Sequence, residues 1–243
     1  MKLINKKENQ IEFVAEVSES LANAVRRYLN HIPVLAIDEV EILKNDSPLY
    51  DETVAHRIGL IPLKTDKSMN DKTIAKLKLS VKKPGMVYSG DFTGNAEIVY
   101  DKIPITSLNK SQELEILATA KMGIGNKHAK FSPGLMFYRN VVDVKINKNC
   151  PKEIIDFCPQ KILKEKNGKV VVEDNLKCDM CEVCVEECKR QEKFDAIKIS
   201  PTKELKISLE SFGQLSVEEI FKNSIEALKK DLNEVSKKVG KIK

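Results

Sequence analysis

A run of four cysteines within eleven residues constrains this chain more than any other feature. The run has the spacing C-x2-C-x2-C-x3-C and consists of Cys178, Cys181, Cys184 and Cys188. Bacterial ferredoxins use this spacing to hold iron–sulfur clusters. The two other cysteines, Cys150 and Cys158, lie a short way upstream, and none precedes them. Six thiols gathered in one segment indicate metal binding more than a disulfide framework.

The spacing predicts a ferredoxin-like domain with one iron–sulfur cluster. Three thiolates at three-residue intervals on a tight loop can bind three corners of a cluster, and the fourth ligand in such folds is a remote cysteine that precedes a proline. Cys158 precedes Pro159. We expect [4Fe–4S] if all four thiolates bind and [3Fe–4S] if one does not. The predicted ligands are Cys158, Cys178, Cys181 and Cys184.

A second cluster is not expected. It would need three more cysteines ten, seven and four positions before Cys158, and those positions hold Lys148, Pro151 and Ile154. Cys150 is out of register with this pattern. Cys150 and Cys188 are therefore spare or additional cysteines, which could pair with each other.

The sequence around the cysteines agrees with a ferredoxin-like unit. The β-prone runs KILKE and KVVVE meet at Asn167-Gly168, a strong hairpin signal. Residues 182–190 can form a short helix, and residues 196–200 (AIKIS) a closing strand. Structural zinc is the main alternative to a cluster, and a cysteine set without metal is another. Zinc is disfavoured because its sites usually combine two separated Cys or His pairs.

The rest of the chain predicts an α+β fold. We expect strands within residues 1–17, a helix from about 20 to 32 that ends at Pro33, a strand at 35–43 and a helix at 51–59. Residues 64–145 alternate β-prone runs with turn residues, which favours a mostly antiparallel module. Two glycines, Gly123 and Gly125, precede Lys130, but a full phosphate-binding motif is absent. A constrained loop that displays basic residues is the better interpretation.

A long C-terminal helix is predicted with a narrow apolar seam. Ser216 and Glu219 form a capping-box pair at its start. The seam residues recur at intervals of four and three, and they are Phe221, Ile225, Leu228, Leu232, Val235 and Val239. Such a seam favours a partner helix. Packing on the chain's own sheet is the alternative.

Several stretches together resemble one family, the archaeal DNA-directed RNA polymerase subunits of the Rpo3 type. This family is related to the third-largest eukaryotic polymerase subunit and to the N-terminal domain of the bacterial α subunit. The resemblance covers essentially the whole chain. Its most specific stretches are LANAVRR at 21–27 with Ile32-Pro33, AHRIGLIPL at 55–63, residues 123–130 and LESFG at 209–213.

This resemblance implies a discontinuous architecture. Residues 1–38 and 203–243 would form a dimerisation domain, residues 39–145 an inserted mostly antiparallel α+β domain, and residues 146–202 a further inserted ferredoxin-like domain. It also implies that the chain forms a heterodimer with the smaller subunit L, on which the large catalytic subunits assemble. The partner-binding residues expected besides the seam are Arg26, Arg27, His56, Arg57 and His128.

The sequence favours a structural role over catalysis. Polymerase chemistry needs closely spaced aspartates that hold Mg²⁺, and the chain has no Asp-x-Asp-x-Asp run. We therefore expect no catalytic residue in this component of a nucleotidyltransferase complex. A stand-alone ferredoxin-like electron-transfer protein is the alternative, although no flavin or nicotinamide motif accompanies the cysteines.

Charge and hydropathy limit the other partners. The net charge is only +5, from 41 Lys and Arg against 36 Asp and Glu, and aromatic residues make up 5%. We therefore expect DNA and RNA to be contacted only indirectly. No apolar run approaches the roughly 18 residues of a membrane span, and the N-terminal residues lack the apolar stretch of a secretory signal. We expect a cytoplasmic protein that contacts no membrane.

Overall fold

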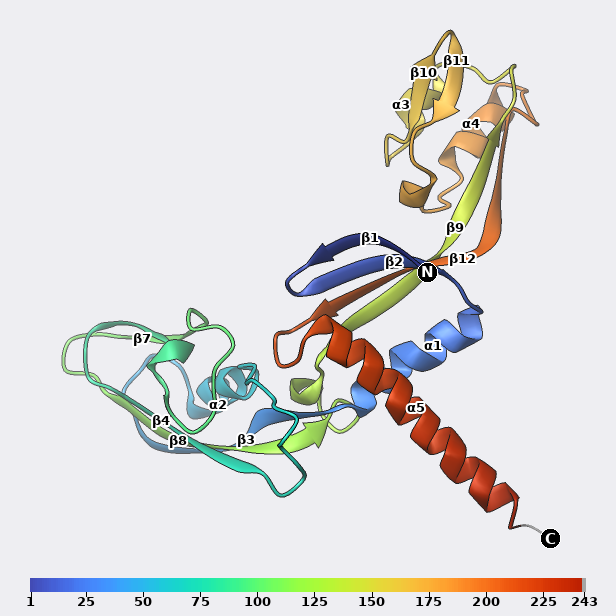
Figure 1. The fold of residues 1–243 in the computed structure, drawn as a ribbon. Coiled ribbons are helices and arrows are strands. Elements are labelled where there is room, and N and C mark those ends of the chain that lie inside the picture. Colours follow the sequence, from blue (N-terminus) through green and yellow to red (C-terminus); the bar gives the residue numbers. More distant parts are fainter. Residues whose placement is uncertain (242–243) are drawn as a thin grey trace. The chain divides into compact units, whose positions relative to one another are not determined.

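The computed structural model describes residues 1–241, so Ile242 and Lys243 of the expected dimerisation domain lie outside the described residues. The chain forms two compact units (Figure 1). The cysteine unit comprises residues 1–6, 11–22 and 137–208. The large unit comprises residues 7–10, 23–136 and the chain from residue 209 onward. Each unit combines segments that are far apart in the sequence.

One four-stranded sheet has the order β1-β2-β12-β9. Its strands are β1 (Lys2–Lys7), β2 (Gln10–Glu16), β12 (Ile197–Ser211) and β9 (Gly134–Ile146). The expected closing strand at 196–200 is only the beginning of β12, so that prediction ended too early. The strand continues because Leu205, Ile207 and Leu209 alternate along it and are all buried.

A second four-stranded sheet, in the large unit, has the order β3-β8-β4-β6. Its strands are β3 (Pro33–Asn45), β8 (Leu114–Ile124), β4 (Ile74–Val81) and β6 (Thr93–Gly94). Neighbouring strands are antiparallel, and the longest pairing runs from Pro33 opposite Ile124 to Asn45 opposite Leu114. Antiparallel strands are therefore present as expected for residues 64–145, but β3 joins them from before residue 64 and β9 belongs to the first sheet.

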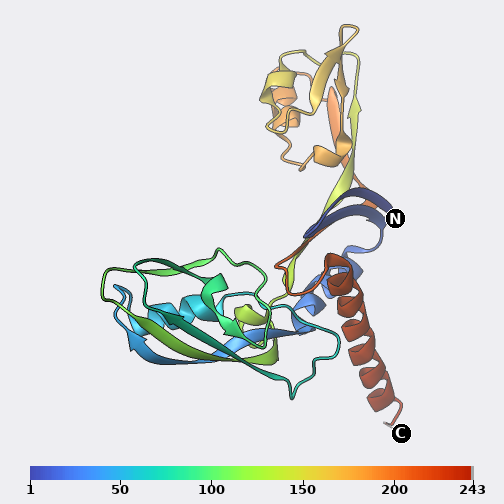
Figure 2. The same ribbon diagram turned by 60° about the vertical axis from the view of Figure 1, so that its left-hand side comes forward.

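The helix α2 (Asp51–Gly59) lies against this sheet (Figure 2). Its apolar face contributes Val54 and Ile58, which are both fully buried. A two-stranded sheet of β5 (Gly85–Tyr88) and β7 (Pro104–Leu108) adds to the same core. That core contains seventeen buried residues, all of them aliphatic or aromatic.

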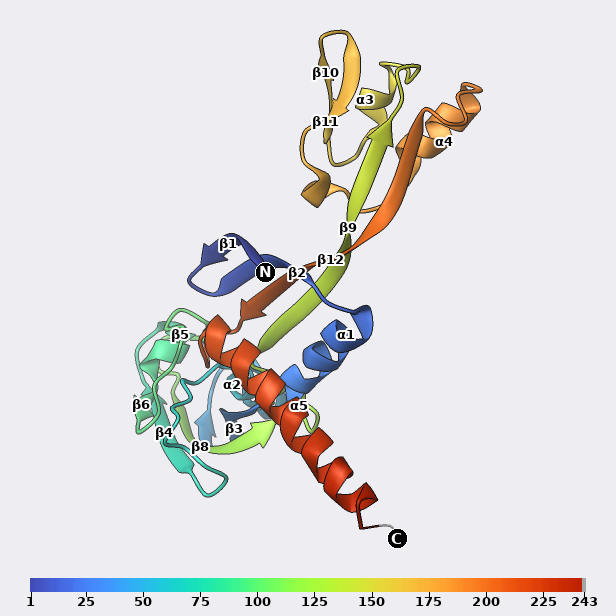
Figure 3. The same cartoon turned by 45° about the vertical axis from the view of Figure 1, so that its right-hand side comes forward.

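The cysteine unit places several short elements around the ends of β9 and β12 (Figure 3). These elements are α3 (Ile154–Phe157), β10 (Leu163–Lys166), β11 (Lys169–Val172) and α4 (Val183–Arg190). The hairpin of β10 and β11 turns at Asn167 and Gly168, with φ angles of 52° and 74°. Both residue types adopt this left-handed conformation readily, so the predicted hairpin is confirmed.

The two remaining α-helices are α1, near the N-terminus, and α5, near the C-terminus. The helix α1 (Glu19–Tyr28) ends in a 3-10 turn before Pro33, close to the predicted end. The helix α5 (Val217–Val239) starts at the expected capping box, where the Glu219 N–H donates to the Ser216 hydroxyl and the Ser216 N–H donates to the Glu219 carboxylate, both at 3.3 Å. Short 3-10 turns complete the chain at η1 (Leu29–His31), η2 (Ser89–Asp91), η3 (Ala129–Phe131) and η4 (Asn175–Lys177).

The observed structure is thus a mixed α and β protein with antiparallel sheets, as the sequence predicts. Among residues 1–241, no helix is both long and apolar enough to cross a membrane.

Candidate metal centre

The loop that carries the cysteine run has an unusual backbone. Met180 and Glu182 both have φ angles of 59°. Residues other than glycine, asparagine and aspartate rarely adopt this left-handed backbone conformation. Such residues cost about 1–3 kcal/mol each and persist only where surrounding contacts impose them. They flank Cys181 on both sides. No local pattern in the sequence indicates this conformation, because neither residue type is typical of it.

One carboxylate links the two segments that supply cysteines. Asp179 accepts a hydrogen bond from the side-chain amide of Gln160 at 3.1 Å and another from the backbone N–H of Cys181 at 3.4 Å. The hydrogen bond from Gln160 is the main reason that the pKa of Asp179 lies below its ordinary value. Gln160 follows the Cys158-Pro159 pair, so this contact positions the remote cysteine segment beside the loop. The sequence did not reveal either residue.

Short helices fix the other cysteines. Cys158 directly follows α3, and Cys184 lies in the first turn of α4, the helix that packs on α3. Cys178 follows the 3-10 turn η4, which begins where the carboxylate of Asp174 accepts a hydrogen bond from the Leu176 N–H at 2.9 Å. Each cysteine is therefore attached to an element with its own capping or packing contacts.

The four predicted ligands line a single small cavity. Its lining consists of Val144, Cys158, Gln160, Ile162, Leu163, Cys178, Asp179, Cys181, Cys184 and Ile199. The thiols of Cys158, Cys178 and Cys184 are buried, and Cys181 is exposed. Asp179, the carboxylate in this lining, is already engaged by Gln160 and Cys181. A mainly apolar cavity with four thiols at its wall fits a sulfur-ligated group.

The thiols influence one another across this cavity. Burial, followed by the nearby Cys158, Cys178 and Cys181, raises the pKa of Cys184 to about 11. This thiol is therefore protonated at neutral pH when nothing binds it. A metal or cluster must displace the proton, so binding to this set would release protons and depend on pH.

A single ion and a cluster place different demands on the four thiols. A zinc site holds four ligands around one point, with Zn–S distances of about 2.3 Å. Within residues 1–241, no group of three or more His, Cys, Asp or Glu side chains is arranged to hold one metal ion. The four thiols line one cavity, and a cluster presents several iron corners to which separate thiolates can bind.

The two spare cysteines lie outside this cavity lining. Cys188 is buried on α4, and the partly exposed Cys150 thiol donates to the Pro151 carbonyl at 3.7 Å. Both are free thiols in the structure.

The residues predicted to bind partners have different surroundings. Arg26, Arg27, His56 and His128 are exposed. Arg57 is also exposed, but its guanidinium donates to the Ile105 carbonyl at 2.6 Å and so links α2 to β7. Along α5, Phe221 and Ile225 are half-buried, Leu228 is buried, and Leu232 and Val235 are exposed.

The loop at Gly123 and Gly125 is constrained by packing. A side chain at Gly123 would overlap the ring of Phe131, and one at Gly125 would overlap Asn30. The expectation of a constrained loop is confirmed, but Lys130 is not displayed. Its ammonium lies 2.7 Å from the Asp38 carboxylate, so it is engaged within the unit.

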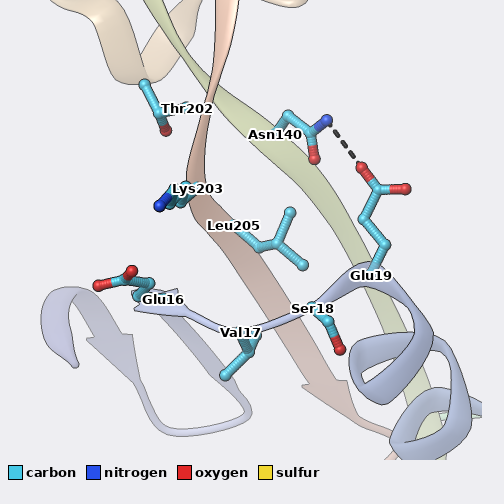
Figure 4. A pocket seen from close by; sticks show the side chains of 8 residues that line it. All are labelled: Glu16, Val17, Ser18, Glu19, Asn140, Thr202, Lys203 and Leu205. Atoms are coloured by element: carbon cyan, nitrogen blue, oxygen red, sulfur yellow. Dashed lines mark hydrogen bonds between the residues drawn. The ribbon is translucent and has the colours of Figure 1, made fainter.

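A second pocket in the cysteine unit has fewer side chains that could bind a metal or cluster. Glu16, Glu19 and Lys203 are the charged residues in its lining (Figure 4). Glu19 accepts a hydrogen bond from the Asn140 amide at 2.9 Å. This lining contains neither cysteine nor histidine, so the cysteine cavity remains the best candidate site.

Comparison with known proteins agrees with the fold. Residues 23–136 match the RNA polymerase Rpb3/RpoA insert domain. The DNA-directed RNA polymerase subunit Rpo3 of Archaeoglobus fulgidus is 31% identical over 263 aligned positions, which cover 100% of this chain and 98% of that protein. The Rpo3 subunit of Pyrococcus horikoshii is 35% identical, with 99% of each chain covered. The RNA polymerase II subunit rpb3 of Dictyostelium discoideum is 29% identical and covers 97% of this chain and 93% of its own length.

An α+β chain with this insert module falls in the class of DNA-directed RNA polymerase subunits of the Rpb3/RpoA type. Within that class, the chain belongs to the archaeal Rpo3 family. The family expected from the sequence is therefore confirmed.

Proposed function

We propose that this polymerase subunit is a non-catalytic assembly subunit. It pairs with the small subunit L, and the heterodimer is the platform for the large catalytic subunits. In this proposal, residues 1–38 and 203–243 form the dimerisation domain, residues 39–145 form one inserted domain, and residues 146–202 form the ferredoxin-like domain. The change of burial along α5 is the observation that carries the proposal.

The first half of α5 packs on its own unit. Val217, Ile220, Ser224 and Leu228 are all buried. After Leu228 the apolar seam continues but is no longer covered, since Leu232 and Val235 are 59% and 58% exposed. Asp231 is still held to the unit, because the Tyr28 hydroxyl donates to its carboxylate at 3.0 Å. The C-terminal end of α5 stands clear of the other elements of its unit in Figures 1 and 3. The sequence offered a partner helix and internal packing as alternatives. Internal packing describes the first half of α5, and we propose a partner for the second.

The exposed apolar residues in the C-terminal half of α5 would stabilise a complex if a partner buried them. Full burial of a Leu or Val side chain stabilises by about 1.5–3 kcal/mol. An apolar stripe on a helix with charged residues between is the pattern by which one amphipathic helix binds another surface. A small partner subunit that covers Leu232, Val235 and Val239 would gain this energy.

Coexpression with the small subunit tests this surface. The double variant Leu232→Asp, Val235→Asp should lose the partner, whereas Asn233→Asp, Ser236→Asp adds the same charge on neighbouring exposed positions and should keep it. Leu228 is avoided, because it is buried within its own unit and its replacement would also unfold α5. If the apolar double variant copurifies with the small subunit at the native stoichiometry, the surface is not the heterodimer interface.

We infer further that the cysteine cavity holds one iron–sulfur cluster, with [4Fe–4S] favoured over [3Fe–4S]. Cys158, Cys178, Cys181 and Cys184 are the proposed ligands. The cluster would supply covalent cross-links between the α3 segment and the α4 segment, and it could also carry an electron. The four thiols around one apolar cavity support this assignment, and the cross-linking role follows from the small size of the surrounding core.

Recruitment of the large subunits is assigned to the exposed basic residues. Arg favours interfaces because its planar guanidinium makes bidentate contacts. Arg57 already donates one hydrogen bond inside the unit, so Arg57→Ala should weaken recruitment and also lower stability slightly. His56→Ala is the cleaner test, since His56 is exposed on the same helix. Both variants should keep the small subunit, and unchanged assembly with the large subunits would contradict this assignment.

A further inference from the structure

One of the four cysteines at the cavity is held differently from the other three. Cys181 is exposed, whereas the other three thiols of the lining are buried. Its backbone N–H donates to the carboxylate of Asp179 at 3.4 Å, whereas the N–H of Cys178 donates to a backbone carbonyl, that of Asn175, at 3.2 Å. A side chain that lines the same cavity therefore helps to position Cys181.

The carboxylate of Asp179 is itself fixed from the other cysteine segment. The side-chain amide of Gln160 donates to one of its oxygens at 3.1 Å, and the N–H of Cys181 donates to the other. Gln160 lies in a tight turn that begins at Cys158, because the Lys161 N–H donates to the Cys158 carbonyl at 3.0 Å. The bridge from Gln160 to Asp179 thus joins the turn after one cysteine to the backbone of another.

The loop around Cys181 needs such contacts. Met180 and Glu182, on either side of it, both have φ angles of 59°, and a backbone of this kind persists only where its surroundings impose it. The bridge is made of amide, carboxylate and backbone N–H groups and uses no sulfur. It therefore constrains the loop and leaves all four thiols available to iron.

We propose that Gln160 and Asp179 are positioning residues that hold Cys181 at the fourth iron of the cluster, and so favour [4Fe–4S] over [3Fe–4S]. This inference rests on the cluster proposed above. Asp179 acts through the backbone of Cys181, and Gln160 acts only through Asp179. The other three cysteines are attached to α3, η4 and α4, so they keep their places without the bridge.

Loss of the fourth iron is a one-electron oxidation. A [4Fe–4S]²⁺ cluster gives one electron to an oxidant such as ferricyanide and releases one Fe²⁺, which leaves [3Fe–4S]⁺ with all four sulfides. The Cys181 thiolate separates from the departing iron and takes up a proton from solvent, and ferricyanide becomes ferrocyanide. The bridge slows this loss because it keeps the Cys181 sulfur beside the iron, where it can bind again.

Conversion by ferricyanide tests the proposal on the purified full chain. The protein is loaded with iron and sulfide without air, treated with the oxidant, desalted and assayed. Iron in the wild type should fall from about four to about three per chain while sulfide stays at about four. Electron paramagnetic resonance gives the rate, because oxidised [3Fe–4S] has a signal and oxidised [4Fe–4S] has none. Alkylation and tandem mass spectrometry should locate the released thiol at Cys181.

Variants of the bridge should convert faster. Gln160→Leu and Asp179→Ala each remove a hydrogen bond that positions Cys181, so the rate should rise about three- to tenfold. The double variant should convert no faster than Asp179→Ala. Asp179→Asn keeps an acceptor for the Cys181 N–H and can still pair with the Gln160 amide, so its rate should stay near that of the wild type.

A matched control lies on α4. Gln191 also donates to a carboxylate, that of Glu187 at 3.3 Å, but neither residue lines the cavity. Gln191→Leu should therefore convert at the wild-type rate. If Asp179→Ala takes up no iron, Gln160→Leu decides alone, since Gln160 is exposed and its replacement leaves the core intact.

Several outcomes would overturn the inference. They are a wild-type rate in Gln160→Leu, an equal acceleration in Gln191→Leu, a rate for Asp179→Asn as high as for Asp179→Ala, a double variant faster than Asp179→Ala, and alkylation of another ligand before Cys181. In each case the wild-type chain still holds its cluster, so the proposed function stands. Zinc without sulfide in the wild-type chain would overturn the cluster and this inference together.

Discussion

The cores of the two units are built from different materials. In the large unit, seventeen buried residues, most of them from β3, β4, β8, α2 and the β5–β7 pair, form one core without a single cysteine. In the cysteine unit, a core of eleven buried residues includes Cys158, Cys178, Cys184 and Cys188. Small units bury too little apolar surface to be stable by packing alone and commonly depend on cross-links or metals. The comparison predicts that one unit depends on side-chain packing and the other on what its sulfurs bind.

Loss of a cluster ligand should have the largest effect. Cys181→Ser should abolish nearly all visible absorbance, reduce the expected iron content of about four per chain, and open residues 146–202 to proteases near Asn167-Gly168. The large unit and the bound small subunit should survive, because they share no ligand with the cysteines. The measurements are iron and sulfide content, limited proteolysis and copurification.

Two results would contradict this first prediction. Zinc without sulfide in the purified wild-type chain would exclude the cluster, and loss of the small subunit in Cys181→Ser would show that the cysteine unit governs dimerisation. Cys150→Ser is the matched control, since this cysteine lies outside the cavity and should leave the iron content unchanged.

Creation of a cavity in the core of the large unit should have the second-largest effect. Leu79 on β4 is fully buried, and Leu79→Ala should destabilise the large unit by about 2–5 kcal/mol. Ile74→Ala, an exposed position on the same strand, should change stability by less than about 0.5 kcal/mol. Chemical denaturation of the metal-loaded protein measures both. If Leu79→Ala lost as much iron as Cys181→Ser, the two cores would not be independent.

The left-handed residues of the cysteine loop allow a smaller test. Glu182→Gly removes a side chain from a residue with φ of 59°, so it should stabilise the loop by up to about 1–2 kcal/mol. The same change within α4, Glu186→Gly, should destabilise by about 1 kcal/mol because glycine disfavours helix. The rate at which a chelator removes the metal reports both variants. Faster release from Glu182→Gly would mean that this backbone conformation is not strained.

The ion pair at Asp38 should give the smallest effect. The hydrogen bond from Lys130, with the charges of Lys130 and Lys121, holds the pKa of Asp38 below its ordinary value of 3.8. Its contribution to folding is therefore complete above that value and is lost as the pH falls through the lower pKa of the folded state. Since Asp38 is about one-third exposed, we expect less than about 1 kcal/mol. Asp38→Asn should make the free energy of unfolding of the large unit depend less on pH in the acid range. An unchanged pH dependence would contradict a stabilising role for this ion pair.

Local signals in the sequence were sufficient for several features. Asn167-Gly168 predicted the hairpin, because both residues tolerate the positive φ angles that a two-residue turn requires. Ser216 and Glu219 predicted the start of α5 through reciprocal hydrogen bonds between close neighbours. The cysteine spacing predicted which four thiols share a surrounding, and the structure places those four at one cavity. Whether they bind a cluster stays a prediction.

Other features depend on residues that are distant in the sequence. The bond from Arg57 to the Ile105 carbonyl, the bond from Gln160 to Asp179 and the pairing of Lys130 with Asp38 each join segments that no local pattern connects. The length of β12 beyond residue 200 likewise follows from burial against other strands.

The sequence by itself determined the elements whose physics is local: turns, caps, the apolar periodicity of α5 and the grouping of the cysteines. Only the tertiary structure decided which half of the α5 seam is buried and which cysteines face the cavity. The physical reason is that an apolar or thiol side chain carries the same local preference whether it faces its own core, a ligand or a partner. Its surroundings are set by how distant segments pack, and a one-dimensional pattern does not contain them.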